Sequence, residues 1–248
     1  MPGRTTGVAS RRHCDTGTTG VSLAHRLAPL AGKPAGTLLI HEVYRSVQGE
    51  STFAGLPCVF VRLAVCDARC TWCDTPYAFR HGEPLTTDQI VAKVEGFSCP
   101  LVEITGGEPL LQVEVLGLMR QLADRGMTVL LETSGAHPLE PVDRRVHVIM
   151  DLKCPDSGEC AGNRWANLDV LKSTDEIKFV IASRGDFDWA VNVIRERRLD
   201  GRFTVLLSPA FGLVQPADLT AWLLEEGLQV RMQLQLHKYI WDPQARGV

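Results

Sequence analysis

The sequence lacks the features that mark membrane proteins and nucleic-acid-binding proteins. It contains no run of about 18 apolar residues that would span a bilayer. No continuous apolar segment follows the arginines near its N-terminus, so a secretory signal is not expected. Its 26 basic and 29 acidic residues give a net charge of −3, which offers no basic surface to nucleic acid or lipid. We therefore expect a cytoplasmic protein with neither a membrane nor a nucleic-acid partner.

The eight cysteines are spaced too unevenly for the framework of a disulfide-rich secreted domain. A chain of 248 residues also buries a sizeable core without such cross-links. We therefore expect reduced cysteines, which suits a cytosolic protein.

Cys66, Cys70 and Cys73 are spaced as C-x3-C-x2-C, and they are the most informative feature of the chain. Polar residues lie between them, unlike three small hydrophobes in a core strand. A structural zinc site usually has two pairs of ligands, and no second pair follows. An iron–sulfur cluster fits better, because three thiolates leave one iron of a four-iron cluster open for a ligand. A zinc site or an electron-transfer cluster without catalysis is the alternative from another class.

Residues 1–36 lack sustained periodicity and are rich in Gly, Thr, Arg, Ala and Pro. We expect a loosely ordered extension there, with at most a short helix near 21–27. Residues 37–248 alternate between strand and helix patterns, as in one domain of about six β/α units. Periodicity alone also allows a doubly wound open sheet. The expected strands are 38–47, 57–65, 101–105, 127–132, 146–151, 177–181, 203–207 and 230–236, and the expected helices are 87–94, 111–122, 187–194 and 216–226.

The loops after the expected strands carry glycine-rich and polar motifs, which is where β/α barrels place their chemistry. Thr105-Gly106-Gly107-Glu108-Pro109 follows one strand, and its two glycines allow the backbone to approach a ligand closely. With the cysteine spacing one β/α unit earlier, this motif resembles the radical S-adenosylmethionine superfamily. The resemblance implies a partial, open and contracted TIM-like β/α barrel that binds a 4Fe-4S cluster and S-adenosylmethionine. It assigns contacts with S-adenosylmethionine to Trp72, Gly106, Gly107, Glu108, Ser134, Lys153 and Ser208.

A second set of motifs narrows the resemblance. Gln48-Gly49-Glu50, Arg62, Cys73-Asp74-Thr75 and Gln235-Leu236-His237-Lys238 together resemble the 7-carboxy-7-deazaguanine synthase family. The resemblance implies radical ring contraction of 6-carboxy-5,6,7,8-tetrahydropterin to 7-carboxy-7-deazaguanine, with loss of ammonia, in queuosine (7-deazapurine) biosynthesis. It assigns substrate contacts to Val47, Gln48, Gly49, Glu50, Arg62, Thr105 and His237.

The chemistry of several of these residues agrees with that role. Arg62 is able to form a bidentate pair with a substrate carboxylate, and Glu50 is able to accept from ring N–H donors. Glu132 and His237 are the candidates for proton transfer. Thr75 matches the family position that binds Mg2+, where substrate and water would complete the oxygen ligands. The resemblance also implies a homodimer and an external one-electron reductant of the flavodoxin or ferredoxin type.

The chain departs from the family pattern at four positions. Ser51 and Val65 stand where Gly is usual, and Asp67 and Ser134 stand where Asn is common. None of these changes removes an expected ligand, although Ser51 alters a loop and Ser134 alters a cofactor contact. Another small radical S-adenosylmethionine enzyme, such as an activase of a glycyl-radical enzyme, is the nearest alternative. Arg62 and His237 at the matching positions favour the ring-contracting enzyme.

Overall fold

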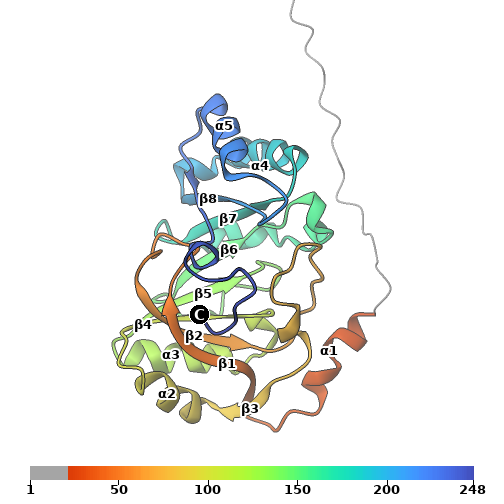
Figure 1. Cartoon of the computed structure of the whole chain (residues 1–248). Helices are drawn as coiled ribbons and strands as arrows, with labels where there is room; N and C mark the ends of the chain where they lie inside the picture. Colours follow the sequence, from red (N-terminus) through yellow and green to blue (C-terminus); the bar gives the residue numbers. More distant parts are fainter. Residues whose placement is uncertain (1–21) are drawn as a thin grey trace, which may run out of the picture.

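The computed structural model describes residues 22–248, which form an open sheet with helices along its outside (Figure 1). Within these residues the strand order is β3-β1-β2-β4-β5-β6-β7-β8-β9. The strands from β2 to β9 in this order are parallel, whereas β1 is antiparallel to both β2 and β3. Because β3 and β9 are separate edges, the sheet does not close. The expected partial, open barrel is confirmed.

The structure gives the following bounds. The strands are β1 Thr37–Val47, β2 Pro57–Leu63, β3 Glu83–Thr86, β4 Leu101–Gly106, β5 Thr128–Thr133, β6 His147–Asp151, β7 Glu176–Ile181, β8 Thr204–Pro209 and β9 Arg231–Met232. The α-helices are α1 Leu23–Ala31, α2 Thr87–Glu95, α3 Val115–Asp124, α4 Arg184–Arg197, α5 Pro216–Glu226 and α6 His237–Ile240. Short 3-10 helices are η1 Pro76–Phe79, η2 Pro109–Leu111, η3 Pro155–Ser157, η4 Cys160–Gly162, η5 Trp165–Asp169 and η6 Leu199–Gly201.

Local sequence signals explain why several elements begin and end where they do. The Thr86 hydroxyl accepts from the N–H of Gln89, whose side chain accepts in return from the N–H of Thr86, so a capping box starts α2. Pro216 occupies the first turn of α5, where its missing N–H has no cost, and Gly227 ends that helix with a φ of 64°. These helices lie where the sequence predicted them.

Two edge features differ from the sequence-based expectation. The strand expected over 230–236 is only Arg231–Met232, because the chain then leaves the sheet and Leu236 donates its N–H to the carbonyl of Gly49 over 3.0 Å. Strand β3 was not expected. It contains Pro84, which a sheet tolerates at an edge because it lacks an N–H.

The connection between β6 and β7 has only 3-10 helices within it, as its Gly- and Pro-rich sequence predicted. At the N-terminal side, residues 1–21 lie outside the described part of the chain. The helix expected near 21–27 is α1, Leu23–Ala31, and its Leu27 and Leu30 pack against a small apolar cluster beside β2. This part of the expected extension is therefore attached to the domain. Within residues 22–248, no helix is long and apolar enough to cross a lipid bilayer.

Candidate active site

The carboxyl ends of the parallel strands surround a cavity of about 650 Å3, a size typical of ligand pockets. Side chains alternate between the two faces of a strand, and along β4 and β7 alternate residues point into the cavity. Glu103 and Thr105 of β4 line it, and so do Lys178 and Val180 of β7. Charged side chains therefore occupy the inside of the barrel, where apolar packing would be expected of a purely structural core.

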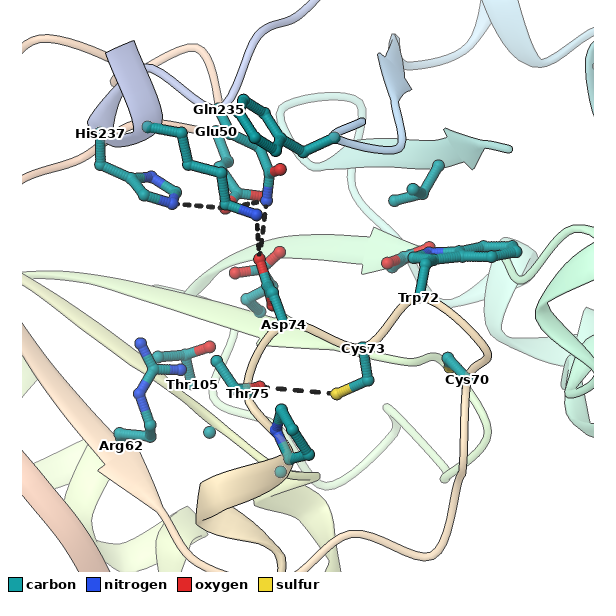
Figure 2. A pocket seen from close by; sticks show the side chains of 18 of the residues that line it. Glu50, Arg62, Cys70, Trp72, Cys73, Asp74, Thr75, Thr105, Gln235 and His237 are labelled. Carbon is teal, nitrogen blue, oxygen red and sulfur yellow. Dashed lines mark hydrogen bonds and ion pairs between the residues drawn. The ribbon is translucent and has the colours of Figure 1, made fainter. Parts of the chain in front are cut away.

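The three cysteines of the predicted cluster motif all line this cavity, and Figure 2 shows Cys70 and Cys73 on the loop that carries them. Arg69 holds the loop in place. Its guanidinium donates to the Cys66 carbonyl over 2.7 Å, and its backbone N–H donates to the Glu159 carboxylate over 2.6 Å. The structure thus brings together the three thiols that the sequence singled out.

The protonation of these thiols bears on what they bind. Burial raises the pKa of both Cys66 and Cys70, so a positive centre is required to hold them as thiolates. Among residues 22–248, no three His, Cys, Asp or Glu side chains converge closely enough to share one metal ion. A four-iron cluster instead takes one thiol at each of three corners, and it fits three thiols arranged around one cavity.

The Gly106–Gly107 segment packs against the end of β2. A Cβ added to Gly106 would lie 2.2 Å from the Leu63 carbonyl oxygen, and one added to Gly107 would lie 2.1 Å from that of Val65. The N–H groups of Gly107 and Glu108 donate to these two carbonyls over 3.0 and 2.9 Å. Val65 itself has a φ of 77°, the left-handed conformation that favours the usual Gly. Both glycines line the cavity, and they also allow this contact with the segment that leads into the cysteine loop.

The predicted contact between Glu108 and S-adenosylmethionine is not supported. The Glu108 side chain is fully buried and does not line the cavity. Its carboxylate accepts from the Thr133 hydroxyl over 2.8 Å, and from the N–H and hydroxyl of Ser134 over 2.8 and 2.6 Å. Glu108 therefore fixes the loop after β4 to the end of β5. Ser134, unlike Glu108, lines the cavity.

Two buried oxygen atoms at the cavity have no hydrogen-bond partner within residues 22–248. They are Oδ1 of Asp151 and Oγ of Ser208. The other Asp151 oxygen pairs with Nζ of Lys153 at 2.8 Å. Because buried polar atoms are normally hydrogen bonded, the two unpaired oxygens indicate a polar ligand. The hydroxyl and amino groups of S-adenosylmethionine fit this requirement, and both Ser208 and Lys153 were predicted to contact it.

Arg62 lines the cavity beside Thr105 (Figure 2). Its Nε donates to Glu42 over 2.8 Å and its Nη2 donates to the Tyr44 hydroxyl over 3.0 Å. Burial alone would lower the pKa of Arg62, but Tyr44, Tyr77 and Glu42 raise it, so the guanidinium stays charged. These contacts use two of its five N–H donors and fix the orientation of the group. The remaining donors can meet a carboxylate.

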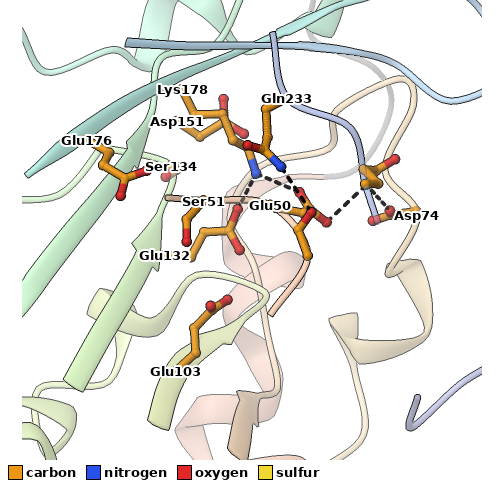
Figure 3. A network of polar contacts seen from close by, with 12 residues as sticks. Glu50, Ser51, Asp74, Glu103, Glu132, Ser134, Asp151, Glu176, Lys178 and Gln233 are labelled. Atoms are coloured by element: carbon orange, nitrogen blue, oxygen red, sulfur yellow. Dashed lines mark hydrogen bonds and ion pairs between the residues drawn. The ribbon is translucent and has the colours of Figure 1, made fainter. Parts of the chain in front are cut away.

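The floor of the cavity holds a network of charged groups that the sequence analysis did not foresee (Figure 3). Lys178 forms ion pairs with Glu50, at 2.8 Å, and with Glu132. Burial would raise the pKa of Glu50, but Lys178 and His237 hold it at about 2. His237 Nε2 lies 3.9 Å from the Glu50 carboxylate, and Gln235 donates to it over 3.1 Å. Glu50 is therefore an ionised acceptor within the cavity, as its predicted role requires.

Gln48 and Gly49 position their neighbours and do not line the cavity, contrary to the predicted substrate contacts. The buried Gln48 amide accepts from the N–H of Glu50 over 3.1 Å and donates to Glu103 over 3.0 Å. A Cβ added to Gly49 would lie 2.9 Å from Nδ1 of His237. The Gln-Gly-Glu motif and the C-terminal motif thus pack together, although they are far apart in the sequence.

The remaining predicted residues also line the cavity, and they are Val47, Trp72 and Thr75. The Thr75 hydroxyl lies 3.8 Å from the Cys73 sulfur. The groups on the cavity wall that the sequence analysis missed include Glu103, Lys178 and the C-terminal segment 243–248. The first two were detectable as charged residues that interrupt apolar strands, because a buried charge needs a partner. The C-terminal segment carried no such signal.

Comparison with known proteins agrees with this geometry. The model of the radical SAM superfamily matches residues 61–208, which include the three cysteines and the strands from β4 to β8. A crystal structure of QueE from Escherichia coli has the same fold, with a TM-score of 0.66 and 22% identity over 83% of this chain and 97% of that chain. The open barrel and its cysteine loop are thus those of a radical S-adenosylmethionine protein, which binds a 4Fe-4S cluster and S-adenosylmethionine.

Relatives of known name narrow the assignment. The 7-carboxy-7-deazaguanine synthase of Chlorobaculum tepidum is 48% identical over 85% of this chain and 97% of its own length. The enzyme of the same name from Koribacter versatilis is 47% identical over 84% of this chain and 99% of its length. That of Methanospirillum hungatei is 36% identical over 93% and 99%. The chain belongs to the 7-carboxy-7-deazaguanine synthase family.

Proposed function

We propose that this protein converts 6-carboxy-5,6,7,8-tetrahydropterin to 7-carboxy-7-deazaguanine and ammonia, as a step in queuosine or other 7-deazapurine biosynthesis. The observation that carries the proposal is that Arg62, Glu50 and His237 line the same cavity as the three cluster thiols. Relatives up to 48% identical, matched over 97% of their length, bear the name of this activity. Their similarity extends over the whole barrel, so it includes the substrate side of the cavity.

The cluster and S-adenosylmethionine, when bound, supply a deoxyadenosyl radical that removes a hydrogen atom from the substrate. The protein's own residues bind and orient the reactants. Lys153 and Ser208 would meet the polar groups of S-adenosylmethionine, and Trp72 would pack beside it, since all three line the cavity. Arg62 receives the substrate carboxylate on its free donors, because Glu42 and Tyr44 already hold the guanidinium in a fixed orientation.

The other side of the substrate meets groups that accept and move protons. The ionised Glu50 carboxylate accepts from ring N–H groups, and His237 donates to a ring carbonyl. Glu132 takes the proton that the product-forming step releases, since its carboxylate lies on the cavity wall next to Lys178. These three side chains come from a loop, a strand end and the C-terminal helix, and the fold gathers them on one wall.

Thr75 is the proposed protein ligand of Mg2+. Its hydroxyl lies at the cavity between the cysteine loop and Arg62 (Figure 2), where substrate oxygens would arrive. Mg2+ often takes one or two protein oxygens and completes its shell with substrate and water. We further propose that the enzyme is a cytoplasmic homodimer, and that a flavodoxin- or ferredoxin-type protein supplies its electron. Sedimentation at micromolar concentration tests the dimer.

The decisive experiment is anaerobic reconstitution with iron and sulfide, followed by an assay with S-adenosylmethionine, Mg2+ and the carboxylated tetrahydropterin. We expect 7-carboxy-7-deazaguanine to form, and the activity to disappear with Cys66→Ala. Cys99→Ala is the matched control, because this buried cysteine lies outside the cavity. Glycyl-radical activation without pterin turnover would favour an activase. Zinc in place of iron, with spectra indifferent to S-adenosylmethionine, would favour a metal-binding module.

A further inference from the structure

The floor of the cavity contains more carboxyl groups than cationic groups to balance them. Glu50 follows β1, Glu103 lies on β4 and Glu132 lies at the end of β5, and all three line the cavity beside Lys178. Lys178, of which only 2% is exposed, contacts Glu50 and Glu132 through its ammonium group. Figure 3 shows Glu103 on the far side of Glu132 from this ammonium.

Glu103 therefore differs from the other two carboxyl groups in its partners. It accepts from the neutral Gln48 amide over 3.0 Å, it forms no ion pair within residues 22–248, and its carboxyl group lies beside that of Glu132 (Figure 3). A buried carboxyl group without a cationic partner favours its neutral form, the more so when other carboxyl groups lie beside it. Only 2% of Glu103 is exposed, so water does not screen a second negative charge there. The burial of Glu103 and its lack of an ion pair thus favour one proton on the two neighbouring carboxyl groups, Glu103 and Glu132.

The electrostatics indicate which of the two holds that proton. Glu132 is paired with the Lys178 ammonium, whereas Glu103 has only the neutral Gln48 amide as a hydrogen-bond donor. Burial, followed by the negative charges of Glu132 and Glu50, raises the pKa of Glu103 well above its usual range. The buried Cys58 thiol also faces Glu103, and burial raises its pKa too, so it adds no charge. Glu103 is therefore the neutral acid, and Glu132 is the base.

We propose that Glu103 is a catalytic acid that works with Glu132 as a one-proton pair in the release of ammonia. This inference rests on the proposed function. Glu132 takes a proton from a ring carbon, and the electron pair of that C–H bond forms the new C=C bond. The C–N bond breaks, and the nitrogen keeps its electron pair.

The proton balance then closes within the pair. Glu103 gives its proton to the departing nitrogen, which leaves as ammonia. Glu132, now protonated, returns a proton to the neighbouring Glu103 carboxylate. No external acid, base, oxidant or reductant is needed, and the pair returns to its starting state. A single carboxylate would have to move from the ring carbon, where it takes up the proton, to the departing nitrogen, where it gives the proton up.

The first test detects the proton itself. Infrared spectra of the reconstituted enzyme at pH 7, with 13C-labelled glutamate to identify the bands, should contain the C=O stretch of a protonated carboxyl group. We expect Glu103→Gln to lose this band and Glu176→Gln to keep it, because Glu176 is an equally buried carboxylate on β7 that does not line the cavity. An unchanged band in Glu103→Gln overturns the proposal. Should that variant fail to load its cluster, Glu132→Gln replaces it: the band should then titrate at lower pH, and an unshifted titration overturns the proposal.

The second test separates the acid step from the earlier steps. Glu103→Gln should lower kcat by about 10²–10⁴-fold with KM within about threefold, since the amide keeps the shape of the side chain. A ring-contracted species that retains the amino group should accumulate, as an isomer of the substrate separable by chromatography. Product formation at the wild-type rate would overturn the role of Glu103. If the wild-type enzyme forms no product, the proposed function fails, while the infrared test still reports whether Glu103 holds a proton.

Discussion

Strand β7 carries two buried charged residues on the same face, and they meet different surroundings. The Glu176 carboxylate, 1% exposed, accepts from the N–H and hydroxyl of Thr52 and lies 2.9 Å from Nε2 of His147. Lys178, two residues along, faces Glu50 and Glu132. We call the first set, Thr52, His147 and Glu176, the lower pair layer. We call the second, Glu50, Glu103, Glu132 and Lys178, the upper carboxyl layer.

The two layers differ in how their charges are matched. In the lower pair layer every carboxylate oxygen has a donor, and Phe53 packs edge-on against the His147 ring at 5.0 Å. The upper carboxyl layer has three carboxyl groups and one ammonium, which contacts Glu50 and Glu132, and all four groups line the cavity. Matched burial stabilises a fold, whereas unmatched burial shifts pKa values and is more typical of functional sites. Strand β7 therefore stabilises the barrel through Glu176 and contributes to the active site through Lys178.

Of the variants considered, the one that removes the Lys178 ammonium should lose the most stability and activity. Lys178→Met leaves the half-buried carboxylates of Glu50 and Glu132 without their cation. We therefore expect a loss of about 3–5 kcal/mol in the free energy of unfolding at pH 7 and no product formation. Lowering the pH to 5 should restore part of the stability, because without Lys178 the burial of Glu50 raises its pKa and the carboxyl group takes up a proton more readily. Urea unfolding at both pH values measures this.

Lys172→Met is the matched control for that variant. Lys172 pairs with the buried Asp175 at 2.7 Å, outside the cavity, and Asp175 also accepts from the N–H of Val148. We expect a smaller loss of stability and unchanged turnover. Equal losses of activity in the two lysine variants would contradict the distinction between the layers.

The pH dependence of stability gives the next effect. Because the pKa of Glu50 is held at about 2 instead of its usual 4.5, its ionised form stabilises the fold fully above pH 4.5. That contribution, about 3 kcal/mol, is lost as the pH falls from 4.5 through 2. Glu50→Gln should lack this component, so its unfolding free energy should vary less over that window. If the unfolding free energies of wild type and Glu50→Gln vary with pH in parallel, the pKa of Glu50 is not lowered in the folded protein.

A change in the lower pair layer should have the smallest effect. His147→Gln removes the ring that contacts Glu176 but leaves both Thr52 donors, so we expect a loss of about 1 kcal/mol. Turnover and KM should stay within twofold of wild type, because these residues do not line the cavity. Thermal unfolding and steady-state kinetics measure the two quantities. A tenfold change in KM would mean that the lower pair layer contributes to substrate binding.

Much of the fold and of the cofactor side was predictable because it depends on local patterns. The alternation of apolar strands with capped helices gave β4 to β8 and the helices between them, and the spacing of Cys66, Cys70 and Cys73 indicated the cluster. Gln48, Gly49 and Glu108 were assigned to ligands, yet they hold other residues in place. A motif does not distinguish a side chain that touches a ligand from one that positions its neighbour, since both are equally constrained in residue type.

The sequence by itself determined the class of chemistry, because three thiols within one short loop can meet one cluster whatever the rest of the chain does. It also placed polar residues at strand ends, which a parallel sheet gathers on one edge. Only the tertiary structure decided that Glu50 and Glu132 share the Lys178 ammonium of β7, and that Glu103 lines the same cavity without an ion pair of its own. These residues are separated by up to 128 positions in the sequence. Their protonation depends on distance and burial, which no single segment contains.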